Sequence, residues 1–393
     1  MKIIVIGNGA AGISAVESIL ENQVDNAYEI KIITSEEASI YYRPMLSDYI
    51  SQSALPNRFF LHPYAWYEEN NIELICGMTV TEILKAQNQV KLKDNRLLSY
   101  DKLILATGSY NFIPPLEGVH LPEVKSLRTL KDAEHIKKMV QPSKHAVVVG
   151  GGLLGLELGW QMIQLGLKVT VVEMMERLLP KQLDPEASAL FLEKVKETGM
   201  HIVTGLGTNS ILGTEHVEGV KLSNDEIIPC DYVLFSIGIR ADVALAQQAG
   251  LDIDKGIIVN DQMQTSVENI YAAGDCAEYL GINYAIWPEA VSQGKTAGLN
   301  AIGQKASYDV LVPFHIYHGM NMRLFSIGDV GRLGETAYDI VRFKKDDHFE
   351  KFFFKEGIIT GGILMGNISK SAKLKNALAH KLTKEAFLES IKG

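Results

Sequence analysis

Three glycines close to the start of the chain have the spacing that binds a dinucleotide. Gly7, Gly9 and Gly12 fit the pattern G-x-G-x-x-G and follow Ile3–Ile6, an apolar run that predicts a buried parallel strand. The first glycine makes a tight turn, the second lets the backbone approach a pyrophosphate, and the third lets the next helix pack closely. The N-terminus of that helix favours the negative phosphates. A glycine-rich turn between any strand and helix is the alternative.

An acidic side chain follows the second predicted strand, at the position that contacts a ribose in dinucleotide sites. After a helix predicted from Ala11 to Leu20, the strand Glu29–Thr34 ends at Ser35 and Glu36. A carboxylate at this position accepts hydrogen bonds from ribose hydroxyls. The order of strand, glycine loop, helix, strand and acid therefore indicates a first dinucleotide site.

Two later segments could approach the same ligand. Pro44 holds Arg43 on a rigid loop, from which the arginine could reach a pyrophosphate or a flavin. An exposed turn with a surface arginine is the alternative. The apolar strand Leu103–Gly108 ends in small residues that allow close approach, although an ordinary structural turn would look the same.

Ser126–Val140 is predicted to be helical, and the chain then repeats its opening pattern. Gly150, Gly152 and Gly155 follow a second apolar run, and the next strand ends at Glu173, 18 residues beyond Gly155. This separation is close to that of a ribose-binding acid. Because a carboxylate repels a 2′-phosphate, NADH is preferred over NADPH. NADPH is the alternative, since Arg177 could fold back toward such a phosphate.

Two dinucleotide sites in one chain suggest that one dinucleotide passes electrons to another. The strand Tyr232–Gly238 is predicted to close the second unit, and Ile270–Ala273 returns the chain to the first. That strand ends at Gly274 and Asp275, where a carboxylate can accept a bond from a polyol hydroxyl. A carboxylate that merely caps a loop is the alternative. The next helix is predicted over Pro288–Ile302, with Trp287 directly ahead of it.

Composition places the chain among globular proteins with more than one domain. At 393 residues it is too long for one ordinary core, and 47% apolar and 22% charged residues are ordinary values. The net charge of −9 argues against general nucleic-acid binding. After residue 307 there are 13 Lys and Arg against 10 Asp and Glu, whereas the preceding part has 25 against 37. The tail is therefore basic relative to the body.

Cysteine spacing and hydropathy indicate which metal and disulfide sites to expect and where in the cell the protein lies. Cys76, Cys230 and Cys276 lie too far apart to predict a disulfide scaffold or a local metal site, so structural thiols are expected. The first strand begins at residue 2 and no apolar run approaches the length of a membrane span. We therefore expect a cytoplasmic protein without a signal peptide.

The C-terminal segment has a different pattern. Val310–Arg323 and Ile340–Met365 alternate apolar and polar residues as strands do, and Ser371–Ile391 is predicted to be helical. A small α+β domain follows from this. His315 and His318 are a close pair, but exposed or core histidines explain them better than a metal site.

Taken together, these motifs resemble the FAD-dependent pyridine nucleotide-disulfide oxidoreductase superfamily over roughly the first 305 residues. The two glycine patterns are joined by A-T-G at Ala106–Gly108 and Y-A-x-G-D at Tyr271–Asp275. Y-Y-R-P-x-L-S at Tyr41–Ser47 and W-x-x-A-x-x-Q-G at Trp287–Gly294 resemble the NADH:rubredoxin and ferredoxin reductase branch. The chain also resembles the flavin module of assimilatory nitrite reductases.

The resemblance implies an α/β fold with two Rossmann-like dinucleotide-binding domains, as in glutathione reductase, and a small C-terminal α+β domain. FAD is expected on residues 1–110 and 245–308, NADH on 111–244, and the α+β domain on 309–393. Glu157 is implied to lie near the nicotinamide and the flavin, and Trp287 could lie against the flavin or pack as an ordinary helix start. The candidate cofactor-binding residues are Gly7, Gly9, Ala10, Ala11, Gly12, Ser35, Glu36, Arg43, Pro44, Ala106, Thr107, Gly108, Gly150, Gly152, Leu153, Leu154, Gly155, Glu173, Gly238, Gly274 and Asp275. Glu157 and Trp287 are the catalytic candidates.

Two departures from the family pattern limit the chemistry. Disulfide-reducing members carry cysteine after the first acid, but Thr34–Ser53 has none, so reduction through a flavin-linked thiol is not expected. Ferredoxin-reductase relatives often place a lysine after the L-S, where it can pair with the glutamate that corresponds to Glu157. This sequence has Asp48 there.

The hypothesis is a flavoenzyme that takes a hydride from NADH onto FAD and passes electrons to a small acidic redox protein, rubredoxin before ferredoxin. The basic tail suits an acidic partner, so high salt should slow the transfer. No nucleic acid or membrane is expected as a partner. An NADH oxidase, the flavin subunit of a nitrite-reducing assembly, and a nucleotide-binding sensor with negligible turnover are the alternatives.

Overall fold

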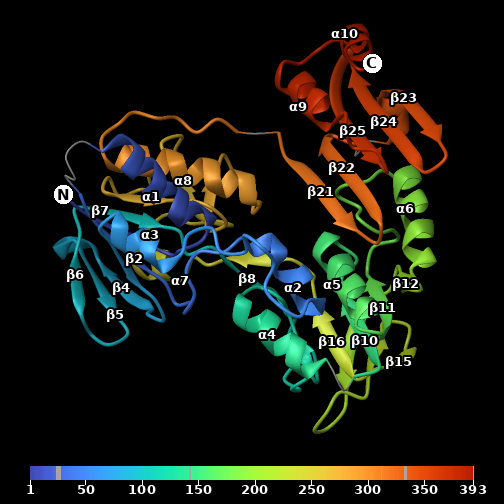
Figure 1. Cartoon of the computed structure of the whole chain (residues 1–393), viewed down its shortest axis with the longest axis horizontal. Helices are drawn as coiled ribbons and strands as arrows, with labels where there is room; N and C mark the ends of the chain where they lie inside the picture. Colours follow the sequence, from blue (N-terminus) through green and yellow to red (C-terminus); the bar gives the residue numbers. More distant parts are fainter. Residues whose placement is uncertain (24–27, 141–142, 311, 332–333, 393) are drawn as a thin grey trace.

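A parallel sheet forms the first part of the fold (Figure 1). The computed structural model describes residues 1–23, 28–140, 143–310, 312–331 and 334–392. The sheet order is β19 (Ile270–Ala272), β7 (Lys102–Leu105), β1 (Lys2–Ile6), β2 (Glu29–Ile33) and β3 (Ile72–Ile75). All these neighbours pair in parallel. The loops after β1, β2, β7 and β19 therefore meet at one edge of the sheet.

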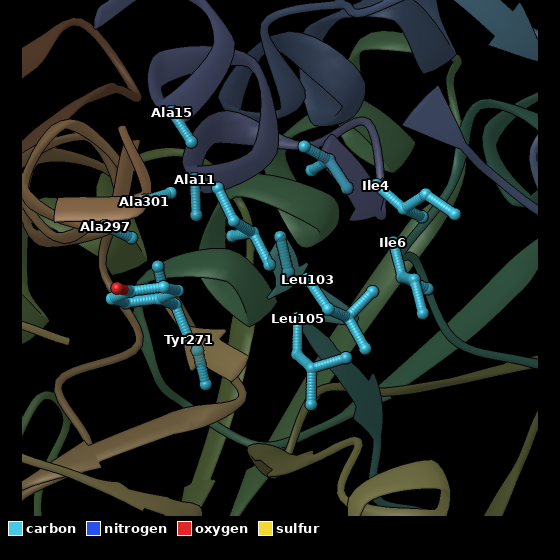
Figure 2. Packing of buried hydrophobic residues seen from close by; sticks show 14 of the residues in the cluster. Ile4, Ile6, Ala11, Ala15, Leu103, Leu105, Tyr271, Ala297 and Ala301 are labelled. Atoms are coloured by element: carbon cyan, nitrogen blue, oxygen red, sulfur yellow. The ribbon is translucent and has the colours of Figure 1, made fainter. Parts of the chain in front are cut away.

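Two helices cover one face of this sheet by close backbone contact. They are α1 (Ala10–Asn22) and α8 (Trp287–Ala301). A Cβ atom on Gly294 or Gly298 would lie only 2.2 or 2.3 Å from a carbonyl oxygen of α1, so glycine is required for this approach. Figure 2 shows small side chains of α1 and α8 meeting beside Tyr271. Segments nearly 300 residues apart in the chain thus share one core.

The second glycine pattern lies on a second parallel sheet. Its order is β12 (His201–Thr204), β11 (Lys168–Glu173), β10 (His145–Val149), β16 (Tyr232–Phe235) and β9 (Val124–Lys125). Helix α5 (Leu153–Gln164) follows β10, and α6 (Pro185–Glu197) connects β11 to β12. The strands β10, β11 and β16 repeat the arrangement of β1, β2 and β7.

An antiparallel sheet forms the C-terminal part. Its order is β21 (Phe314–Gly319), β22 (Met322–Gly328), β25 (Ile358–Met365), β24 (His348–Lys355) and β23 (Asp339–Lys345). The helices α9 (Ser371–Ala379) and α10 (Lys384–Ser390) pack on it. This part stands beside α5 and α6 in Figure 1. Its Tyr317 packs edge-on against Phe191 of α6, with ring centroids 5.8 Å apart.

The remaining elements are short. The connecting strands are β4 (Val80–Leu84), β5 (Gln89–Leu92), β6 (Leu97–Ser99), β8 (Ser109–Asn111), β13 (Thr208–Leu212), β14 (Gly219–Leu222), β15 (Ile227–Pro229), β17 (Ile239–Ala241), β18 (Ile257–Val259) and β20 (Ala277–Tyr279). The connecting helices are α2 (Leu46–Ser51), α3 (Tyr64–Glu69), α4 (Leu130–Met139), α7 (Ala244–Gln248) and the 3-10 turns η1 (Arg43–Met45), η2 (Lys85–Gln87) and η3 (Glu335–Ala337). Across the described residues, no helix combines the length and apolar character needed to span a bilayer.

The structure corrects three predicted boundaries. The helix predicted from Ser126 begins four residues later, because Thr129 and Asp132 form a reciprocal capping box at its start. The helix predicted over Ser371–Ile391 is divided into α9 and α10, with Lys381 between them at a φ of 50°. Trp287 is the first residue of α8 rather than the residue ahead of it.

Candidate functional site

A cavity of ≈ 730 Å³ opens at the carboxyl edge of the first sheet. The candidate residues that line it are Gly7, Gly9, Ala10, Ala11, Ser35, Glu36, Arg43, Pro44, Ala106, Thr107, Gly108, Leu154, Glu157, Gly274, Asp275 and Trp287. They come from the loops after four strands of the first sheet, from the start of α1, from η1, from α5 and from α8. The candidates outside this lining are Gly12, Gly150, Gly152, Leu153, Gly155, Glu173 and Gly238.

The first glycine loop fits a pyrophosphate. A Cβ atom on Gly7 would lie 2.0 Å from the Ala106 carbonyl oxygen, and one on Gly12 would lie 2.0 Å from the Gly7 carbonyl oxygen. Protein packing therefore requires these two glycines. A Cβ atom on Gly9 would meet no protein atom within 4 Å. The space beside Gly9 is left for a ligand, as the binding pattern predicts.

The predicted ribose acid is held by two side chains. Glu36 Oε1 accepts a hydrogen bond from Arg43 Nη2 at 2.7 Å, and Glu36 Oε2 accepts one from the Tyr41 hydroxyl at 2.5 Å. Arg43 Nη1 also donates to the Arg128 carbonyl oxygen at 2.6 Å. Arg43 thus lines the cavity beside Glu36 and orients its carboxylate.

Asp275 has a charged partner that the sequence did not indicate. Its Oδ2 accepts hydrogen bonds from Ser109 Oγ at 2.7 Å and from Arg128 Nη2 at 2.8 Å. Both bonds end on one oxygen, so Oδ1 keeps its capacity to accept from a polyol such as the ribityl chain of FAD. Arg128 directly precedes the Thr129 cap of α4 and lines the cavity. A basic residue before a capping box is common on surfaces, so its type alone gave no signal.

Helix α5 connects the second glycine loop to the cavity beside the first. It follows the second glycine loop, yet Leu154 and Glu157 line the cavity of the first. Glu157 Oε2 accepts a hydrogen bond from Ser47 Oγ at 3.3 Å. Burial raises the pKa of Glu157 to about 7; the Ser47 bond opposes this and the nearby Asp48 adds to it. A half-buried acid with a pKa near neutrality therefore faces the cavity.

The second glycine loop repeats the packing of the first. A Cβ atom on Gly150 would lie 2.2 Å from the Ser236 carbonyl oxygen, and one on Gly155 would lie 2.0 Å from the Gly150 carbonyl oxygen. A Cβ atom on Gly152 would meet nothing within 4 Å. Leu153 begins α5 directly after this open position. The second loop therefore fits a second pyrophosphate.

The second predicted ribose acid, Glu173, is oriented by backbone groups. Glu173 accepts hydrogen bonds from the Gly151 N–H at 2.7 Å and from the Met175 N–H at 2.8 Å. Arg177 donates to the Pro180 carbonyl oxygen at 3.2 Å, so it is engaged within its own loop. Gly238 follows β16 with a φ of 105°, a conformation that favours glycine.

An aromatic pair lies at the start of α8. The Trp287 ring meets the exposed Tyr42 ring edge-on, with centroids 5.0 Å apart and planes at 76°. Trp287 also lines the cavity. It therefore reaches from the cofactor cavity toward a side chain that solvent contacts.

The cysteines of the described chain lie apart from the cavity. The three cysteines are free, and none of them is among the residues that line the cavity. Burial raises the pKa of Cys230 to about 12 and also raises that of Cys276. No cluster of His, Cys, Asp and Glu in the described ranges could hold a metal ion.

Comparison with protein families gives two matches. Residues 1–294 match the model of the pyridine nucleotide-disulphide oxidoreductase family. Residues 313–382 match the model of the rubredoxin NAD+ reductase C-terminal domain. The first match covers both glycine patterns, and the second covers the antiparallel sheet.

Among curated proteins, the chain is 33% identical over 374 residues to nitrite reductase [NAD(P)H] of Bacillus subtilis, covering 95% of this chain and 46% of that protein. It is 30% identical over 377 residues to NADH-rubredoxin oxidoreductase of Clostridium acetobutylicum, covering 96% and 94%. The chain thus spans about half the length of the first relative and nearly all of the second.

Solved structures show the same fold over almost the whole chain. The crystal structure of the NADH:rubredoxin oxidoreductase from Clostridium acetobutylicum is 29% identical with a TM-score of 0.83, and the match covers 99% of both chains. A putidaredoxin reductase in covalent complex with putidaredoxin is 25% identical with a TM-score of 0.89, covering 98% of this chain and 95% of that chain.

Proposed function

The chain belongs to the pyridine nucleotide-disulphide oxidoreductase family, and from that premise we propose that it oxidises NADH through bound FAD and reduces a small redox protein, most simply rubredoxin. FAD is assigned to residues 1–110 and 245–308, and NADH to residues 111–244. The two parallel sheets support this division, because each carries its own glycine loop and acid. The C-terminal part, residues 309–393, is assigned to contact with the redox partner.

One observation carries the proposal. Leu154 and Glu157, which follow the second glycine loop, line the same cavity as Gly9 and Asp275 of the first unit. A dinucleotide on each loop would bring its reactive ring toward this shared space. Proximity of this kind lowers the entropic barrier to reaction.

Each group of residues has a defined task in this proposal. Gly9 and Gly152 leave room for pyrophosphates, Glu36 holds a ribose, and Asp275 with Arg128 orients the polyol chain. Bound FAD supplies the redox chemistry, accepting a hydride and returning electrons. Glu157 holds or releases a proton at the cavity wall.

Three observations favour a protein acceptor over a thiol substrate. None of the cavity-lining residues in the described ranges is a cysteine. The pair Tyr42 and Trp287 extends from the cavity to the surface. The C-terminal part matches a domain named for rubredoxin reduction.

Not every basic residue of the C-terminal part can attract an acidic partner. The side chain of Lys351 is fully buried, so its charge does not contribute to electrostatic attraction at the surface.

A single substitution tests whether the surface formed by Tyr42 and Trp287 is the acceptor face, meaning the surface that the electron acceptor contacts. Trp287→Ala should leave flavin reduction by NADH within about twofold and slow rubredoxin reduction at least tenfold, because the aromatic surface at the cavity mouth is lost. Leu280→Ala, at a side chain that is 76% exposed, is the control for a general surface effect. Equal rates of rubredoxin reduction in both variants would contradict the assigned face.

A second candidate is the flavin module of a nitrite-reducing assembly. It is favoured by the 33% identity to a nitrite reductase of which this chain spans 46%. In that case the purified chain would bind a second, nitrite-reducing chain and would reduce rubredoxin no faster than it reduces oxygen. Pull-down with the chain followed by nitrite turnover separates the two candidates.

A further inference from the structure

Glu157 faces the cavity without a basic partner. Its described contacts give it one hydrogen bond, from Ser47, and no ion pair with a Lys or Arg side chain. A carboxyl group in this setting gains its negative charge only at a cost in solvation. The neighbouring groups therefore decide at which pH Glu157 ionises.

Asp48 is fixed beside Glu157 by a polar network. Gln161, one helical turn after Glu157 on α5, donates from Nε2 to Asp48 Oδ1 at 3.1 Å. Ser51 Oγ in turn donates to Gln161 Oε1. The Asp48 side chain is exposed, although partial burial raises the pKa of its carboxyl. A negative charge is thereby held next to Glu157.

Groups on the other packed elements do not offset this charge. Tyr317 of β21 is fully buried, its hydroxyl has no hydrogen-bond partner among the described residues, and its pKa is raised by burial and by the Glu157 and Asp48 carboxyls. Lys137 of α4 donates instead to the carbonyl oxygens of Tyr49 and Gln52, at the far end of α2. Glu157 thus has a neutral hydroxyl and a carboxyl group as neighbours, and no Lys or Arg side chain among its described contacts.

We propose that Asp48 is a positioning residue that adds to the burial of Glu157 in favouring its acid form, so that Glu157 attracts the cationic ring of NAD+ more strongly on the alkaline side. This inference rests on the proposed function, because it takes Glu157 to lie beside the nicotinamide. The oxidised ring carries a positive charge that reduced nicotinamide lacks. An ionised Glu157 therefore favours NAD+, and Asp48 shifts the pH at which this begins upward.

Binding equilibria test the inference without turnover. NAD+ and ADP-ribose are titrated calorimetrically into the oxidised FAD-loaded protein between pH 5.5 and 8.5. ADP-ribose lacks the nicotinamide, so its affinity should not follow the ionisation of Glu157. For the native chain the NAD+ affinity should rise about three- to tenfold from acid to alkaline pH, centred near pH 7.

Substitutions then show which residue causes the pH dependence of NAD+ affinity. Asp48→Asn removes the like charge with little change in shape and should move the midpoint about half a pH unit or more downward. Asp48→Ser is the second variant, and Glu157→Gln should abolish the pH dependence. Asp94→Asn, at an exposed acid paired with Arg96, is the matched control and should leave the midpoint unchanged.

The outcomes separate this inference from the proposed function. If NAD+ affinity depends on pH but both Asp48 variants keep the native midpoint, Asp48 has no positioning role. If NAD+ affinity is as flat as that of ADP-ribose, Glu157 does not act on the nicotinamide. If neither ligand binds at any pH, the nucleotide site itself is wrong and the proposed function fails with it.

Discussion

The ammonium group of Lys351 lies 2.6 Å from Asp184 Oδ2, and both side chains are buried, at 0% and 1% exposure. Lys351 belongs to β24 of the C-terminal sheet, whereas Asp184 caps helix α6 beside the second parallel sheet. Lys351 Nζ also contacts Glu186 Oε2 at 2.7 Å. This ion pair joins the C-terminal part to the unit that contains the second parallel sheet, together with the apolar contacts around Phe191 and Tyr317.

Removing Lys351 should therefore be costly. Lys351→Ala leaves the Asp184 carboxylate buried without its cation, and we expect the free energy of unfolding to fall by about 3–5 kcal/mol. Denaturant unfolding at pH 7 measures the change. Lys392→Ala, which removes an exposed pair with Glu389, should cost less than about 1 kcal/mol. Similar losses for the two variants would contradict the account of this interface.

The stability of the chain should depend on the charge of Glu157. Its pKa in the folded state is about 7, above the ordinary value of 4.5, so the folded state binds the proton more tightly than the unfolded state. Stability is then lost as the pH rises from about 4.5 to 7. Glu157→Gln should be more stable relative to the native chain at pH 8 than at pH 5, by about 1–2 kcal/mol after allowance for solvent screening. A difference that stays constant with pH would refute the raised pKa.

Substitutions at Gly9 and Gly152, where a Cβ atom would meet no protein atom within 4 Å, should weaken cofactor binding without lowering the stability of the fold. Gly9 and Gly152 have ordinary negative φ values of −96° and −80°, so alanine fits their backbone. Gly9→Ala should keep its thermal stability without FAD but retain far less flavin absorbance after purification. Gly152→Val should keep FAD and lose NADH affinity at least tenfold, since its side chain enters only the second pyrophosphate space.

A matched substitution at a packed glycine provides the contrast. Gly12→Ala would place a Cβ atom 2.0 Å from a backbone oxygen, so it should lower the melting temperature of the protein before any cofactor is added. If Gly9→Ala lowered it as much, the distinction between packing and ligand glycines would be wrong.

Glu173 should control the choice of nucleotide. Two backbone N–H groups orient its carboxylate, which repels a 2′-phosphate. Glu173→Ala should lower the ratio of kcat/KM for NADH over NADPH about tenfold. Steady-state kinetics with both nucleotides measure the ratio, and Glu176→Ala is the nearby acidic control. An unchanged ratio in Glu173→Ala would assign specificity to another residue.

Local patterns predicted the parallel strands and glycine turns well, because each depends on a few adjacent residues. The strand predicted over Ile3–Ile6 is β1, and Gly7 and Gly150 have φ values of 112° and 113°, as tight turns require. The family, its α/β fold and its cofactor class followed from the motifs and are confirmed by the family match. The assignment of individual residues to FAD and NADH remains a prediction.

Contacts between distant segments could not be predicted in this way. Arg128 pairs with Asp275 across 147 residues, and Lys351 reaches Asp184 across 167. No periodicity or short motif specifies such pairs, since they depend on how whole sheets are placed. The helix boundary at Thr129 was missed for a different reason, because its capping box lies within a continuous helix-compatible run.

The most direct test of the proposed function is anaerobic stopped-flow absorbance of the FAD-loaded protein. NADH is mixed first, and the reduced protein is then mixed with rubredoxin, ferredoxin or air-saturated buffer. We expect NADH to bleach the flavin and rubredoxin to restore its absorbance at least tenfold faster than oxygen does. Faster reoxidation by oxygen than by either protein would contradict the reductase and make the chain an NADH oxidase.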